Sequence, residues 1–111
     1  MNYLVVGQHK FNSADSWREH LIFSSDKEIT DEELERKFYM HYVYKFFEDD
    51  FTFTPEDRKS WSEEDYIDTF QENDGDAIVD YILKTKEPIP SFEITDSLAS
   101  SGGGWALKIN I

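Results

Sequence analysis

The amino-acid sequence predicts an α+β fold, with an antiparallel sheet of about four strands packed on a central helix and on two or three shorter acidic helices. Three observations lead to this prediction. Short β-branched and aromatic segments, typical of strands, stand near both ends of the chain. The middle holds several helix start signals. With 111 residues, 16% of them aromatic, the chain has the length and apolar content of a single domain over residues 1–111.

The first quarter of the chain predicts an N-terminal hairpin. Residues 3–6, Tyr-Leu-Val-Val, form a β-branched apolar run that indicates a first strand, and residues 12–16 have the composition of a turn. Residues 17–24 fit either a second strand or a helix capped by Ser13 or Asp15, and the apolar run that ends in Ser-Ser-Asp favours the strand.

A long central helix is expected next. Thr30 followed by Glu33 has the spacing of a capping box, which predicts a helix from Asp31 to Phe47. Its apolar side chains sweep through a broad arc, so we expect it to be covered on more than one side.

Shorter helices are expected after it. Thr54 with Pro55 in the first helical position indicates one start, and Ser62 followed by three acids indicates another. After a break at residues 73–76, residues 77–84 predict a short helix. The inward side chains of this last helix would be Ile78, Tyr81 and Ile82.

The C-terminal part predicts a second hairpin. Residues 91–95 and 105–111 alternate between apolar and polar positions, as strands do. The segment 96–104 between them ends in Ser-Ser-Gly-Gly-Gly and reads as a flexible loop. Its glycines could also allow a close approach to a ligand, but they match neither a dinucleotide-binding nor a P-loop pattern.

The charge balance limits the classes of partner. The chain has 24 acidic against 11 basic residues, a net charge of −13, so phosphates and anionic membranes repel it. We therefore expect no direct nucleic-acid binding and no membrane binding, and we expect a basic protein surface as partner. There is no cysteine, which excludes disulfides, and no secretory signal or membrane span is seen, so the expected location is the cytoplasm, that of the host if a phage encodes the chain.

The charge is concentrated in residues 48–80, which hold 13 acids and two basic residues, a net charge of −11. On the predicted helix, Glu64, Asp68 and Glu72 share one face, with about 6 Å of rise between neighbours. Each strand of a duplex has one phosphate per about 3.4 Å of axis, so such a row approximates phosphates in density. The hypothesis is a DNA-mimicking surface, and the alternative is an ordinary solvated helix face.

The candidate partner-binding residues come from this stretch and its aromatic neighbours. They are Glu48, Asp49, Asp50, Glu63, Glu64, Asp65, Asp68, Glu72, Asp74, Asp76, Trp61 and Tyr44. Trp61 and Tyr44 would act as interface anchors beside the acids. Residues 48–50 with 74 and 76 could hold a cation through oxygen, but Phe70 and Tyr81 stand where an EF-hand needs acids, so no metal and no cofactor is expected.

Catalysis is not expected. His9, His20 and His41 lie far apart without ligand spacing, and His41 reads as solvated between two lysines of the central helix. The sequence has no HExxH and no GxSxG motif.

In size, charge and the clustering of acids from Glu48 to Asp80, the chain resembles the small acidic inhibitors of phages and mobile elements: anti-CRISPR proteins, anti-restriction DNA mimics and uracil-DNA glycosylase inhibitors. The resemblance implies an inhibitor that blocks the basic channel of a nucleic-acid enzyme, such as a CRISPR effector or another host defence nuclease. It has no motif and assigns no residue. The alternatives are an immunity protein or antitoxin that neutralises a toxin, and a viral structural or assembly protein with an exposed strand edge at residues 105–111.

Overall fold

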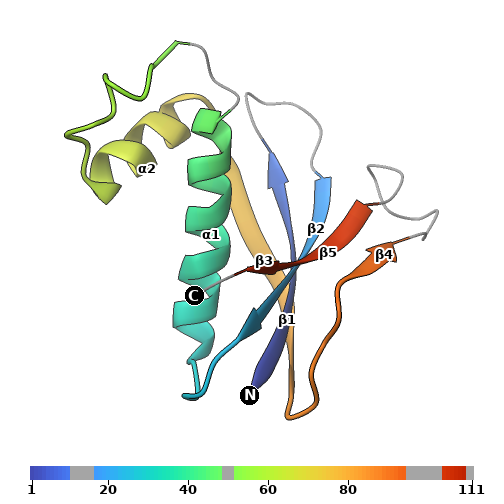
Figure 1. Ribbon diagram of the computed structural model, residues 1–111. Helices are drawn as coiled ribbons and strands as arrows, with labels where there is room; N and C mark the ends of the chain where they lie inside the picture. The colour runs from blue at the N-terminus through green and yellow to red at the C-terminus, as the bar shows by residue number, and fades with distance from the viewer. Residues whose placement is uncertain (11–16, 49–51, 95–103, 110–111) are drawn as a thin grey trace.

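The computed structural model describes residues 1–10, 17–48, 52–94 and 104–109. Its elements follow the order β1 (Asn2–Lys10), β2 (Trp17–Ser24), α1 (Asp31–Glu48), α2 (Glu63–Glu72), β3 (Asp76–Thr85), β4 (Phe92–Ile94) and β5 (Gly104–Ile109). Figure 1 shows a sheet with the long helix α1 beside it, which confirms the predicted α+β class. The segment predicted as a loop, residues 96–104, lies almost wholly outside the described residues, with only Gly104 inside.

The five strands lie in the order β3-β1-β2-β5-β4. Both predicted hairpins are confirmed, because β1 pairs antiparallel with β2, and β4 with β5. The prediction of a purely antiparallel sheet is wrong, because β5 pairs in parallel with β2 and so joins the two hairpins. As a consequence β5 is an interior strand, and the expected exposed edge at residues 105–111 is not found in its described part.

The short helix predicted over residues 77–84 is also wrong, because these residues belong to strand β3. The strand pairs with β1 along its length, and a shift of register between Val6 and Gly7 breaks the simple alternation of side chains. Ile78 and Tyr81, expected to face inward, are 58% and 56% exposed, whereas Ile82 packs against the core. A broken two-residue period can imitate the spacing of a helix, which explains the error.

Helix α1 is confirmed, and it is covered on two sides as predicted. The backbone N–H of Glu33 donates to the Thr30 hydroxyl at 3.2 Å, as the capping signal requires. One side of α1 packs on the sheet through a cluster formed by Leu34, Phe38 and Tyr42 with Tyr3, Val5, Leu21 and Phe23. The other side packs on α2 through Met40, Val43, Phe46 and Phe47 with Phe70.

The predicted helix that would start at Thr54 is not formed. Thr54 and Asp57 exchange the expected side-chain to backbone hydrogen bonds, at 3.0 and 3.2 Å. The chain nevertheless continues as turns over residues 55–60 before α2 begins. The capping contacts are satisfied in a turn, so the signal alone does not require a helix. Of the two or three shorter acidic helices expected, the described residues contain only α2.

Candidate functional site

Helix α2 is held in place by a local signal and by packing. The Ser62 side chain accepts from the backbone N–H of Asp65 at 3.2 Å, and the Asp65 carboxylate accepts from the backbone N–H of Ser62 at 2.9 Å, so the capping box is complete. Phe70, fully buried, fixes the opposite face of α2 against α1. The polar face of the helix is therefore turned away from the core.

That polar face presents Glu64, Asp68 and Glu72, which we call the acidic row. All three residues are exposed. Their i, i+4 spacing stacks them along the helix with about 6 Å of rise between neighbours. In the described part of the chain, no lysine, arginine or histidine nitrogen lies within 4.0 Å of these carboxylates. The row is thus an exposed and locally uncompensated line of negative charge.

The two basic residues of the acidic stretch do not neutralise the row. The Arg58 guanidinium lies over the Phe47 ring, 5.9 Å from its centre. The Lys59 ammonium lies 3.9 Å from Glu56, within the turns that precede α2. Neither cation therefore lies within 4.0 Å of a carboxylate of the row.

The remaining acids predicted for the site have different environments. Glu63 accepts from Arg36 of α1 at 2.8 Å, and Asp65 is used by the helix cap. Glu48 is exposed at the end of α1. Asp49 and Asp50 lie outside the described residues.

Two further predicted acids lie where α2 gives way to β3. Asp74 adopts a positive φ of 59° in the turn after α2. Asp76, half-buried, accepts from the N–H of Ala77 at 2.9 Å at the start of β3. These residues shape the turn between two elements and do not extend the acidic row along the helix.

The two predicted aromatic anchors differ. Trp61 is half-buried, and its ring packs at 5.1–5.4 Å between centres against Phe47, Phe53 and Tyr66. Tyr44 is 41% exposed and stacks edge to face on Tyr66 of α2. Partial burial and then the nearby Glu63 carboxylate raise the pKa of Tyr44. Tyr44 is thus the accessible aromatic beside the acidic helix, whereas Trp61 serves mainly the core.

A second cluster of ionisable groups, which sequence reasoning missed, surrounds Tyr42. His9, only 3% exposed, stacks on the Tyr42 ring at 4.3 Å, and His41 contacts the same ring edge to face at 4.9 Å. His41 is half-buried, so the prediction that it is solvated is wrong. The His9 Nδ1 lies 3.2 Å from a Glu19 carboxylate oxygen. The two histidines are distant in sequence, and only the packing of α1 on β1 brings them together.

Burial explains the titration of this cluster. It lowers the pKa of His9 to about 4, with the nearby Lys45 and His41 charges adding to the effect. It also raises the pKa values of Glu19 and Tyr42. Burial therefore disfavours the charged form of each of these groups, as expected for ionisable side chains inside a core.

The stability of the fold should consequently fall as the pH drops from about 6.5 to 4. In the unfolded chain His9 takes up a proton near the ordinary histidine pKa of about 6.5, but in the folded protein its pKa is about 4, so protons favour unfolding in this window. The raised pKa of Glu19 acts oppositely, costing stability as the pH rises above about 4.5. Urea unfolding of Glu19→Gln and of Glu19→Gln/His9→Phe should isolate the histidine. Between pH 7.5 and 4.5 the free energy of unfolding of Glu19→Gln should fall by up to about 3 kcal/mol more than that of Glu19→Gln/His9→Phe. If the free energies of the two variants changed in parallel with pH, this assignment to His9 would be contradicted.

Within the described residues, no group of three or more His, Asp or Glu side chains is placed to hold a metal ion. Over the same residues, neither helix has the length and apolar character needed to cross a bilayer.

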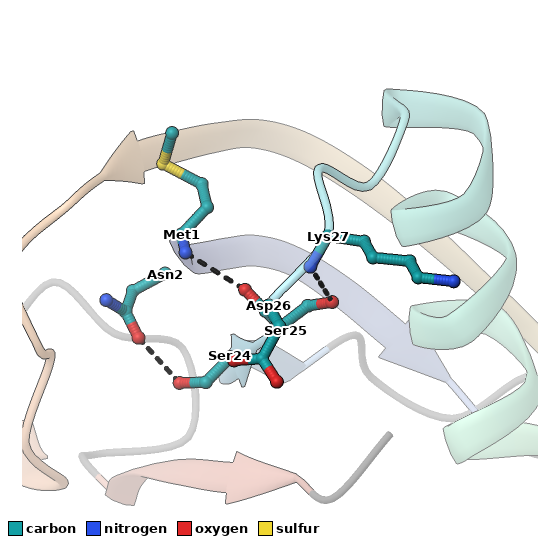
Figure 2. A pocket seen from close by; sticks show the side chains of 6 residues that line it. All are labelled: Met1, Asn2, Ser24, Ser25, Asp26 and Lys27. Carbon is teal, nitrogen blue, oxygen red and sulfur yellow. Dashed lines mark hydrogen bonds between the residues drawn. The ribbon is translucent and has the colours of Figure 1, made fainter.

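One open pocket, of about 560 Å³, lies at the sheet end where β1 begins and β2 ends (Figure 2). Its polar groups pair with one another: the Ser24 hydroxyl donates to Asn2 at 2.6 Å, and the Met1 amine donates to the Ser25 carbonyl at 2.9 Å. Figure 2 shows the Lys27 side chain extending away from the other residues. These hydrogen bonds join the start of β1 to the end of β2, and the pocket has no nucleophile–base pair.

Comparison with known proteins adds no guide to this site: no protein-family model matches the chain, and no curated protein or solved structure shows significant similarity to it.

Proposed function

We propose that this chain is a small acidic binding protein that inhibits a nucleic-acid enzyme, such as a CRISPR effector or another host defence nuclease, by presenting the acidic row to its basic channel. The observation that carries the proposal is the exposure of Glu64, Asp68 and Glu72 with no described cation within 4.0 Å. Like charges at i, i+4 destabilise a helix by a few tenths of a kcal/mol per pair. A row that lowers helix stability is understandable if a partner supplies the missing positive charge.

The surroundings of the row support a contact surface. Tyr44 offers a partly exposed aromatic ring next to α2, and tyrosine is among the residues that contribute most at interfaces. Helix α2 is anchored by Phe70 and by its capping box, so the carboxylates are held on a regular helix before binding. Little ordering is then needed on association, which favours affinity.

Binding rather than catalysis is proposed because the most perturbed ionisable groups lie in the core. His9 is 3% exposed and Tyr42 is 1% exposed. A catalytic acid or base must reach the proton that it transfers within hydrogen-bond distance. His9 is almost wholly covered by its stacking on Tyr42, and the Tyr42 ring is enclosed by the core and by the rings of both histidines.

Affinity capture from the native host lysate tests the proposal. The tagged chain should retain a protein with a basic nucleic-acid channel, nuclease treatment should not release it, and retention should fall steeply between about 50 and 200 mM salt. With the purified partner, duplex DNA and this chain should compete. Binding that is insensitive to salt, or a ternary complex with DNA, would argue against the acidic row as a nucleic-acid mimic. Capture of a single toxin would favour the immunity-protein alternative.

A further inference from the structure

A groove separate from the acidic row runs between α1 and strand β3. It has a volume of about 430 Å³, with Glu32, Glu35 and Tyr39 of α1 on one side and Ile78 and Val79 of β3 on the other. Figure 1 shows α1 running beside β3 at this end of the sheet. A helix can cover the edge of a sheet, but the groove shows that space remains here between α1 and β3.

Strand β3 is ten residues long and is the last strand of the sheet on this side, pairing with β1 alone among the described strands. An edge strand offers a row of backbone donors and acceptors that can pair with another chain. The bulge opposite Val6 and Gly7 and the exposed charges of Asp80 and Lys84 are partial safeguards, but the strand contains no proline. Its capacity to pair with an added strand is therefore largely retained.

The two sides of an added strand would meet different surfaces. Ile78, Tyr81 and Leu83 are 58%, 56% and 53% exposed on β3, whereas Ala77, Val79 and Ile82 pack toward the core below α1. Side chains of a strand alternate between its two faces. On the α1 side they would approach Glu32 and Glu35 together with the groove-lining Ile78, and on the opposite side they would lie beside Tyr81 and Leu83.

We propose that this groove binds an extended segment of a partner protein, in which basic and apolar residues alternate, as an added strand on β3. The basic residues would pair with Glu32 and Glu35, both exposed. Arg36, the cation of the groove, is already held by Glu63 at 2.8 Å. A second copy of this chain fits less well, because it would bring another net charge of −13 to the same edge. The inference does not depend on the acidic row.

Synthetic peptides test the groove directly. The first is a repeat of alternating Lys and Val, the second has Glu in place of Lys, and the third keeps the Lys–Val sequence but has a central proline, which removes a backbone donor. The Lys–Val peptide should bind with salt-sensitive affinity in fluorescence anisotropy and should slow hydrogen exchange of β3 amides. The proline and Glu peptides should bind at least about tenfold more weakly. Equal binding of the proline peptide would overturn the added-strand proposal, since charge alone would then explain it.

Matched variants separate the groove from general acidity. Glu32→Lys/Glu35→Lys should weaken the Lys–Val peptide about tenfold or more, and the milder Glu32→Gln/Glu35→Gln serves if the first variant fails to fold. Reversal of Glu64, Asp68 and Glu72 changes more charge, yet it should weaken the peptide by only about twofold to threefold. An equal loss in both would overturn the groove assignment. Concentration-dependent dimerisation that protects the β3 amides would overturn it too, by showing that a second copy fills the edge.

Discussion

Reversal of the acidic row in the variant Glu64→Lys/Asp68→Lys/Glu72→Lys should abolish retention of the basic partner while leaving the chain folded. Three attractive charges become repulsive ones at the centre of the proposed contact, and like-charge juxtaposition at an interface costs several kcal/mol. The fold should tolerate the change because all three side chains are exposed and lack a described ion-pair partner. Lysine near the start of α2 is unfavourable by about 0.3–1 kcal/mol, and lysine at its end is favourable by a similar amount.

The control is a variant with the same change in net charge at other exposed acids, Asp26→Lys/Glu28→Lys/Glu87→Lys. Titration calorimetry with the captured partner should show at most a several-fold loss for the control, from weaker long-range steering. Thermal melting followed by circular dichroism should place both variants within a few degrees of the parent chain. If the control loses binding as fully as the row variant, total charge rather than this helix face determines recognition.

The parts of the structure that were predictable from sequence are those fixed by local chemistry. Ser62 with Asp65 specifies the start of α2, and the same few residues also place Glu64 outward. Thr30 with Glu33 likewise specifies the start of α1. Capping needs only neighbours in sequence, so it can be recognised without knowledge of the tertiary contacts. The exposed acidic row was therefore accessible from the sequence alone.

The errors come from contacts between distant residues. The parallel pairing of Leu21 with Leu107 depends on where β5 returns to the sheet, and no local pattern records it. Strand β3 was mistaken for a helix because the bulge opposite Val6 and Gly7 disturbs its alternation. For the same reason the exposed edge, and with it the groove beside α1, could not be foreseen. The cluster of His9 and His41 around Tyr42 likewise exists only once the helix has packed on the sheet.

Substitution of Gly7 by alanine should be among the most damaging small changes in the chain. A Cβ atom built at Gly7 would lie 2.3 Å from the backbone oxygen of Ile78 and 2.6 Å from a ring carbon of Phe38. To avoid these overlaps, β3 would have to move away from β1, or the fully buried Phe38 would have to leave the core. Overpacking usually costs about 1–3 kcal/mol and can cost more where the backbone must shift. We expect Gly7→Ala to lower the free energy of unfolding, measured with urea, by at least about 3 kcal/mol.

A double-mutant cycle shows which of the two contacts decides the loss. Phe38→Leu replaces the ring that the Cβ atom would meet by a shorter side chain but leaves the Ile78 carbonyl in place. In the Phe38→Leu background, Gly7→Ala should therefore still lower the free energy of unfolding by more than half as much as it does in the parent chain. Because the carbonyl belongs to the edge strand, the double variant should still show faster hydrogen exchange at β3 amides than Phe38→Leu alone. Full recovery in the double variant would mean that the ring is the obstacle. A Gly7→Ala protein as stable as the parent chain would contradict the close approach of β1 and β3, and with it the position of the groove edge.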